Sequence, residues 1–287
     1  MEPPMFTPDT LREKTFLVTG GGSGLGRAMA LGFARAGAKV AVLGRRPEPL
    51  QETVAAIQAL GGVAAWASAD VRDPASIAAA VDSLEAELGP INGLVNNAAG
   101  NFLSPSEELS PNAFNSVVQI VLYGTFHTTQ ELGRRWIERG TGGVILSIVT
   151  TYAWMGSAFV LPSAAAKAGV LAMARSLAVE WAHYNIRCNA IAPGPFPTEG
   201  AFSRLMMPGA QEEALNHIPL RRFGKPEELA DLATYMMSDM ASFMTGECVV
   251  IDGGEWLYSG QEFGHIAGYD REMVKQFMAA MRPSKKG

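Results

Sequence analysis

The sequence has little cysteine and little histidine, with 2 and 4 of these residues in a chain of 287. Cys188 and Cys248 lie in strand-like runs, and their spacing matches neither a metal site nor a redox pair. We therefore expect two buried free thiols in a reducing compartment and predict a cytoplasmic location. None of the histidines stands at metal-ligand spacing from a second ligand, so no metal site is predicted.

Long apolar runs and long basic runs are also missing. No apolar run reaches the ~18 residues that a membrane-spanning helix needs, and no run of lysine and arginine exceeds a pair. Residues 1–11 contain no cationic segment followed by an apolar stretch, as a secretory signal would. With a formal net charge of −5, these features argue against a nucleic-acid partner and against a membrane partner.

Short β-branched runs alternate with helical patterns along almost the whole chain, without repeats or a strong linker. Near-continuous apolar strands between helices are typical of a parallel sheet that is covered on both faces. We predict an α/β fold, a Rossmann-like doubly wound parallel sheet of about seven strands, with a ligand site beyond the carboxyl ends of the strands. Residues 1–287 are assigned to one domain, with a core at 14–254, a substrate loop at 194–225 and a C-terminal tail at 255–287. The expected strands are Thr15–Thr19, Lys39–Leu43, Val63–Ala69, Gly93–Asn96, Gly143–Val149, Arg187–Ile191 and Cys248–Ile251; the expected helices are Leu25–Ala36, Pro49–Leu60, Pro74–Leu88, Pro111–Glu138, Ala164–His183, Pro226–Ser238 and a stretch near Asp270–Met281.

A glycine-rich segment follows the first expected strand and opens the first expected helix. Glycines at such a junction allow a tight turn and let a pyrophosphate approach the positive end of the helix. We therefore expect this segment to hold a dinucleotide. The candidate residues are Gly20, Gly22, Ser23, Gly24, Leu25 and Gly26.

Charged residues end the second and third expected strands. Arg45 and Arg46 follow the second strand, where an acidic residue would bind a free ribose 2′-hydroxyl and an arginine accommodates a 2′-phosphate. The expected cofactor is therefore NADPH, with Arg45 as the first candidate and Arg46 as the alternative. Asp70 and Val71 end the third strand, where the Asp70 carboxylate suits an adenine amino group.

The fourth expected strand ends in small residues, Asn96-Asn97-Ala98-Ala99-Gly100. Together with the glycine segment, Asp70-Val71, Lys167, Ala192-Pro193-Gly194 and Asp252-Gly253-Gly254, this order of motifs resembles the short-chain dehydrogenase/reductases over essentially the whole chain. The resemblance implies a homotetramer, in which Lys167 binds the nicotinamide ribose and lowers the pKa of a catalytic phenol. It also implies cofactor contacts from Asn97, Gly100, Pro193, Gly194 and Phe196.

The tyrosine of that family is missing from its usual place. In Ser163-Ala164-Ala165-Ala166-Lys167 a serine stands where the family has tyrosine, on the same helix face as the lysine. A phenol occurs upstream instead, at Tyr152, which we place at the end of a strand. The family's usual serine corresponds to Thr150, and its usual helix asparagine corresponds to Val121.

With Tyr152 as the phenol, the pattern resembles the mitochondrial-type 2,4-dienoyl-CoA reductases. Residues 96–102, 162–169, 200–205 and 259–263 carry this likeness. It implies that Tyr152 and Asn101 form an oxyanion hole for the dienolate produced when hydride reaches the distal alkene carbon. Ser163 is a further catalytic candidate, although a serine at a helix start is first expected to be a cap.

The implied substrate is an acyl-CoA, whose phosphates Arg72 and Arg204 could meet by charge-assisted hydrogen bonds. Phe102 and Ser110 are further substrate-binding candidates, and the loop from Phe196 to Met207 could be an acyl lid or simple packing. The expected activity is NADPH-dependent reduction of 2,4-dienoyl-CoA to 3-enoyl-CoA in β-oxidation of unsaturated fatty acids. The alternatives are a carbonyl reductase acting on 3-oxoacyl thioesters and a catalytically inactive NADPH-binding protein.

Overall fold

Seven parallel strands form a single sheet at the centre of the computed structural model, which describes residues 6–198, 211–260, 266 and 268–280. The strand order is β3-β2-β1-β4-β5-β6-β7, so the direction of winding reverses beside β1. Such a switch point is where doubly wound sheets bind ligands. The predicted fold class is confirmed. The strands are β1 (Thr15–Thr19), β2 (Lys39–Gly44), β3 (Ala64–Ser68), β4 (Gly93–Asn96), β5 (Gly143–Ile148), β6 (Ile186–Pro193) and β7 (Cys248–Ile251).

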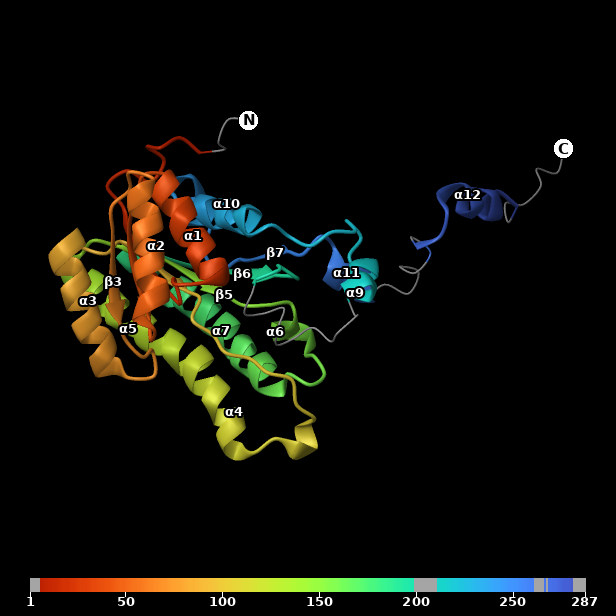
Figure 1. The fold of residues 1–287 in the computed structure, drawn as a ribbon, viewed down its shortest axis with the longest axis horizontal. Helices are drawn as coiled ribbons and strands as arrows, with labels where there is room; N and C mark the ends of the chain where they lie inside the picture. The colour runs from red at the N-terminus through yellow and green to blue at the C-terminus, as the bar shows by residue number, and fades with distance from the viewer. Residues whose placement is uncertain (1–5, 199–210, 261–265, 267, 281–287) are drawn as a thin grey trace.

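Helices cover both faces of the sheet (Figure 1). Because side chains alternate across a strand, Val18 and Val40 enter the core on one face, while Leu17 and Ala41 enter the core on the other. Trp136 is the largest fully buried side chain, and its Nε1 donates to the Ile91 carbonyl at 2.7 Å. The first face carries α1 (Gly24–Arg35), α2 (Pro47–Ala59) and α10 (Pro226–Met237); the second carries α3 (Pro74–Leu88), α5 (Gly124–Arg139) and α7 (Leu161–Glu180).

The helix predicted over residues 111–138 is interrupted, so that prediction is wrong in its middle. The structure has α4 (Pro111–Val118), a π-helical turn η2 (Gln119–Tyr123) and then α5. At the start of α5, a Cβ on Gly124 would lie 2.6 Å from Cγ2 of Val71, so only glycine fits this approach to the chain after β3. π-Turns are rare and often lie at functional sites, and Ile120 of η2 reaches the pocket described below.

Tyr152 does not end a strand, which corrects the placement made from sequence. Strand β5 ends at Ile148, and Tyr152 begins a short helix, α6 (Tyr152–Met155). The Ala153 amide donates to the Thr150 carbonyl, and Gly156 ends α6 with a φ of 74°. This extra turn carries the phenol away from the strand and toward α7.

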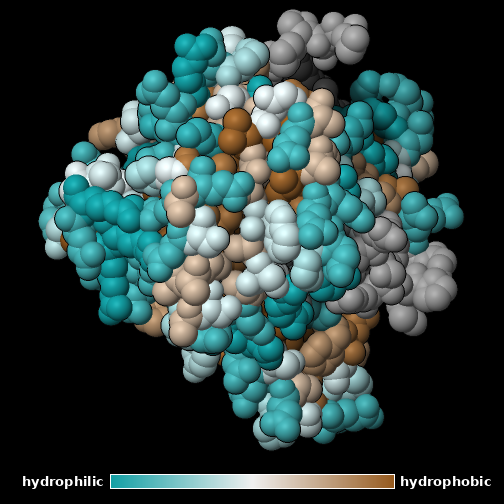
Figure 2. Space-filling model, turned by 60° about the vertical axis from the view of Figure 1, so that its left-hand side comes forward, coloured by the Kyte–Doolittle hydropathy of each residue, from teal (hydrophilic) through white to brown (hydrophobic). Residues whose placement is uncertain are grey.

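The other described elements lie at the rims of the sheet and in the C-terminal part. Helix α12 lies apart from the sheet and its helices (Figure 1). On the side that carries α2 and α3, the surface is mainly hydrophilic, with apolar residues in scattered patches (Figure 2). These elements are η1 (Ser106–Glu108), η3 (Ala182–Tyr184), η4 (Asp239–Ala241), α9 (Gln211–His217), α11 (Glu255–Gly260) and α12 (Arg271–Ala280).

Both cysteines are free, as predicted, but only Cys188 is buried; Cys248 is half-buried, so the prediction of two buried thiols is wrong for it. Burial raises the pKa of the Cys188 thiol to about 12 and that of Cys248 to about 11, so neither is a thiolate near neutral pH. Within the described ranges, we find no helix with the length and apolar character needed to cross a membrane. The same part of the chain contains no group of three or more potential metal ligands.

Candidate active site

The glycine-rich turn between β1 and α1 is shaped by close backbone contacts. Gly20 has a φ of +65°, in the left-handed region that favours glycine. A Cβ on Gly26 would lie 2.4 Å from the Gly20 carbonyl oxygen and 2.5 Å from Nδ2 of Asn97. Only glycine therefore fits at these two positions, and the close packing brings the turn to the start of α1, where backbone amides suit a phosphate group.

Asn97 supports this turn from the end of β4. Its Nδ2 donates to the carbonyls of Thr19 and Gly20 at 3.0 and 3.3 Å, and its backbone amide donates to Oγ1 of Thr19 at 3.0 Å. The Thr19 hydroxyl also donates to the Val95 carbonyl and accepts from the Ala98 amide. The sequence analysis did not single out Thr19, although its place between a strand and a glycine turn could have drawn attention to it.

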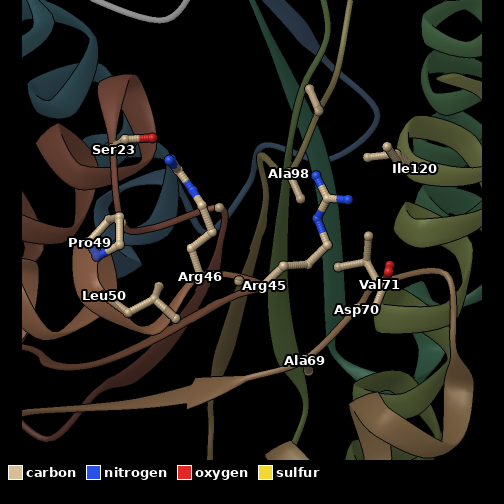
Figure 3. A pocket seen from close by; sticks show the side chains of 14 residues that line it. Ser23, Arg45, Arg46, Pro49, Leu50, Ala69, Asp70, Val71, Ala98 and Ile120 are labelled. Carbon is tan, nitrogen blue, oxygen red and sulfur yellow. The ribbon is translucent and has the colours of Figure 1, made fainter. Parts of the chain in front are cut away.

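A cavity of about 470 Å³ opens at the carboxyl ends of β1, β2, β3 and β4. In Figure 3, the Arg46 side chain points toward Ser23, while Arg45 extends toward Ala98 and Val71. Both arginines are exposed, so their guanidinium groups can turn toward an anion without a burial cost. The cavity brings together residues predicted from four separate segments. Its lining includes Gly20, Gly22, Ser23, Arg45, Arg46, Asp70, Val71, Ala98 and Ile120.

Asp70 and Arg72 form an ion pair at the floor of this cavity. Arg72 Nη2 lies 2.5 Å from Oδ2 of Asp70, and the Arg72 backbone amide donates to Oδ1 at 3.0 Å. The side-chain hydrogen bond from Arg72 lowers the pKa of Asp70, which burial opposes. Asp70 is thus held as a carboxylate that can accept further hydrogen bonds, and Arg72 is directed to Asp70 in this structure.

A second cluster joins three segments around the Tyr152 phenol. Its hydroxyl lies 3.0 Å from Oγ of Ser163, and Nδ2 of Asn101 donates to it at 3.4 Å. The Phe102 backbone amide donates to Oδ1 of Asn101 at 2.9 Å, which fixes the amide with its nitrogen toward the phenol. Ser163 lies inside α7, which begins at Leu161, so its buried hydroxyl serves the phenol and the capping role first expected for it is wrong.

Lys167 lies one turn beyond Ser163 on α7 and is 8% exposed. Its Nζ donates to the carbonyl of Ile148, the last residue of β5. Burial lowers the pKa of Lys167 to about 8, because a charged ammonium loses its hydration in the protein interior. Lys167 thus lies at the end of β5, shortly before Tyr152. Its ammonium group loses its proton at a lower pH than an exposed lysine does.

Tyr152 also lines a separate cavity of about 290 Å³. Its walls come from α6, from the turn after β6 and from α11. Trp154 of α6 packs edge to face against Trp256 of α11, with ring centroids 5.5 Å apart. Glu255 belongs to this lining, and the sequence analysis did not single it out. Its only sequence signal is its position directly after Asp252-Gly253-Gly254. The lining comprises Thr150, Thr151, Tyr152, Met155, Ser157, Pro193, Gly194, Pro195, Glu255, Trp256 and Ser259.

The other residues discussed from sequence that the structure describes do not line either of these two cavities. Phe196 is buried, and its ring lies where a Cβ on Gly224 would be, so its side chain packs in the core. The Ser110 hydroxyl accepts from the Ala113 amide as the cap of α4. Phe102 packs on the small core cluster beside α7. Arg204, the expected CoA contact, lies outside the described residues, as do the Phe202 segment and the tail at 261–265.

The chain is similar to known proteins over most of its length. A family model described as enoyl-(acyl carrier protein) reductase matches residues 20–255. A Bacillus subtilis (strain 168) protein, named a probable 2,4-dienoyl-CoA reductase producing (2E)-enoyl-CoA, is 45% identical over 86% of this chain and 98% of that protein. A Caenorhabditis elegans protein, named probable 2,4-dienoyl-CoA reductase 3 producing (3E)-enoyl-CoA, is 43% identical over 91% and 85% of the two chains. A crystal structure from Agrobacterium tumefaciens with bound NADP superposes with a TM-score of 0.80 at 32% identity, covering 87% of this chain and 99% of that one.

Proposed function

The chain belongs to the short-chain dehydrogenase/reductase family of oxidoreductases, and from that premise we propose that it reduces 2,4-dienoyl-CoA to 3-enoyl-CoA with NADPH. The Bacillus subtilis and Caenorhabditis elegans relatives support the substrate class, since both are named as probable 2,4-dienoyl-CoA reductases. The observation that carries the proposal is the position of the Tyr152 phenol, which reaches Ser163 from α6 and accepts a hydrogen bond from Asn101.

The chemistry of a conjugated thioester accounts for this position. Hydride added to the distal alkene carbon places negative charge several bonds away, on the thioester oxygen. A phenol at position 163 would suit a substrate whose oxygen sits on the carbon that receives hydride. Because Tyr152 bonds to Ser163 from outside α7, its hydroxyl lies beyond that position, and a donor there suits an oxygen further from the nicotinamide.

Tyr152, Asn101 and Lys167 stabilise the dienolate in different ways. The Tyr152 hydroxyl donates to the thioester oxygen, and the second N–H of the Asn101 amide donates beside it. The Phe102 amide keeps the Asn101 nitrogen turned toward that oxygen. Preorganised donors of this kind lower the barrier because they need no reorientation as charge develops. Lys167 holds the cofactor ribose and adds positive charge near the reacting atoms.

The first cavity fits a nicotinamide dinucleotide phosphate. Gly20, Gly22 and Ser23 line this cavity at the start of α1, where backbone amides suit a pyrophosphate. Asp70, held ionised by Arg72, is an acceptor for an adenine amino group. Bound NADPH would supply the hydride. Exposed Arg45 and Arg46 at the end of β2 support a 2′-phosphate, and therefore NADPH over NADH.

We expect Arg45→Ala to raise the dissociation constant of NADPH about tenfold or more. The lost charge-assisted contact is worth ~1.5–3 kcal/mol, and NADH affinity should hardly change. Fluorescence titration of both cofactors against wild type and Arg45→Ala measures this, with Arg46→Ala as the matched comparison on the neighbouring residue. Equal losses for the two cofactors, or a wild type that prefers NADH, would contradict the assignment.

The proposed activity is tested by cofactor oxidation. Purified protein with NADPH should consume 2,4-hexadienoyl-CoA much faster than a 3-oxoacyl-CoA. A carbonyl reductase would show the reverse order, and an inactive cofactor-binding protein would bind NADPH and consume neither. Either result would overturn the proposal.

We also propose that the enzyme is a homotetramer. Apolar and aromatic side chains are exposed on the helices η2, α5 and α7, and Tyr123, Phe126 and Val179 are examples. Burial of such side chains between subunits is favourable. Sedimentation equilibrium should give four chains per particle, and a monomer at micromolar concentration would contradict this.

A further inference from the structure

Glu255 faces the same cavity as Tyr152 from another wall. Its carboxylate lies near Gly194, because a Cβ on Gly194 would be 3.3 Å from Oε2 of Glu255. Tyr152 stands on α6, and Glu255 begins α11. The contact between Trp154 and Trp256 holds these two short helices face to face. A substrate bound against Tyr152 in this cavity therefore has Glu255 on a second side.

The Glu255 carboxylate has no structural task among the described residues. Asp252, close by in sequence, accepts hydrogen bonds from the amides of Gly254 and Trp256 and so fixes the turn into α11. No hydrogen bond or ion pair of the Glu255 carboxylate occurs within the described ranges, although the residue is half-buried. A half-buried carboxylate that serves no hydrogen bond of the described fold and faces a cavity is available to a bound substrate.

The surroundings of Glu255 favour its protonated form. Burial raises the pKa of the Glu255 carboxyl, and the negative charge of Asp252 raises it further, while His217 on α9 opposes the shift. Tyr152 is the other titratable side chain on the wall of this cavity. A carboxylic acid that faces a bound substrate can deliver its proton to a carbon.

Reduction of a dienoyl thioester requires such a proton. After hydride addition, the substrate is a dienolate whose electron pair is spread over the thioester oxygen, the α carbon and the γ carbon. Protonation at the α carbon gives the 3-enoyl product, and protonation at the γ carbon gives the 2-enoyl product. The α carbon lies two bonds from the oxygen that Tyr152 and Asn101 hold, so an acid on the adjoining wall can reach it.

We propose that Glu255 is the acid that protonates the α carbon of the dienolate and so directs the reaction to 3-enoyl-CoA; this rests on the function proposed above. The O–H bond of the Glu255 carboxyl breaks and a C–H bond forms at the α carbon. The enolate electron pair supplies the new bond, and the thioester carbonyl is restored. Glu255 is left as a carboxylate and regains its proton from solvent at the exposed part of its side chain.

Glu255→Gln keeps the shape of the side chain and removes the acid. It should lower kcat for hexadienoyl-CoA about 10²-fold, the scale of a positioned general acid, and should raise the share of 2-enoyl-CoA in the product. Glu255→Asp should retain part of the rate. The matched control is Glu247→Gln, since Glu247 is an exposed carboxylate before β7 and outside the cavity. NADPH affinity should match wild type in all three variants, which also verifies folding.

A second measurement tests the proton transfer without net reduction of the dienoyl substrate. Wild-type enzyme with NADP⁺ and 3-enoyl-CoA in D₂O should exchange the α hydrogens, because the same carboxylate acts as a base in reverse. NMR should show this exchange about 10²-fold slower in Glu255→Gln and unchanged in Glu247→Gln. If Glu255→Gln matches wild type in rate, product ratio and exchange, Glu255 is not the acid. If wild-type enzyme instead fails to reduce hexadienoyl-CoA, the proposed function itself is wrong.

Discussion

Tyr152→Phe should lower kcat for dienoyl-CoA reduction by about 10²-fold or more, the scale of losing one oxyanion donor. The substitution removes only the hydroxyl, which lies 3.0 Å from Oγ of Ser163 and accepts from Nδ2 of Asn101. The α6 backbone and the Trp154 contact stay in place. Steady-state kinetics on hexadienoyl-CoA measure the loss, and NADPH titration should show unchanged affinity, because the glycine turn and Lys167 are untouched.

Variants of Asn101 and Ser163 distinguish residues that bind the thioester oxygen from a residue that only orients the Tyr152 phenol. Asn101→Ala should resemble Tyr152→Phe, since both side chains bind the same thioester oxygen, and the double variant should lose less than the product of the two effects. Ser163→Ala should cost less than about tenfold, because Ser163 orients the phenol and need not touch the substrate. If Ser163→Ala were inactive and Tyr152→Phe active, Tyr152 would not be the residue that donates to the thioester oxygen.

Lys167→Met should also lower kcat by about 10²-fold or more, since it removes a positive charge from the reacting centre. Methionine has a similar length and no charge, so α7 can keep its packing. The Ile148 carbonyl loses its Lys167 donor. Activity on hexadienoyl-CoA and NADPH affinity should both fall. If NADPH affinity and kcat survive, the lysine does not hold the cofactor.

The same lysine makes activity and stability respond to pH in opposite directions. Burial lowers the pKa of Lys167 to about 8 in the folded protein, against 10.5 when unperturbed. Between these values the unfolded chain binds more protons than the folded one, so this group makes the free energy of unfolding rise with pH. Activity should fall over the same range, as the ammonium is lost. Urea denaturation of wild type and Lys167→Met across this range checks the first effect, because the variant lacks that rise.

Most of the sheet could be predicted from local pattern. Thr15–Thr19, Gly93–Asn96 and Cys248–Ile251 have the predicted bounds. The first two are parallel strands buried on both faces, which read as continuous apolar runs. The break at Gln119–Tyr123 could not be predicted in this way. Its residues are ordinary helix formers, and the turn accompanies the approach of Gly124 to Val71, a residue far away in sequence.

In the candidate site, too, some features could be predicted from local sequence and others could not. The glycine turn, Arg45 and Asp70 follow strands at motif spacing, and parallel strands bring their carboxyl ends to one edge, so the sequence could predict that these residues line one cavity. The pairing of Asp70 with Arg72 depends on side-chain geometry, and no motif spacing indicated it.

The sequence by itself determined the fold class, the order of the motifs at the strand ends and the fact that Ser163 replaces the usual tyrosine, because strand periodicity and motif order are local properties of the chain. Only the tertiary structure decided that Ser163 hydrogen-bonds to the Tyr152 phenol, which Asn101 also reaches, and that Glu255 shares a cavity with Tyr152. These contacts join separate helices and loops. They depend on the short turn of α6 and on the Trp154–Trp256 packing, which no local pattern encodes.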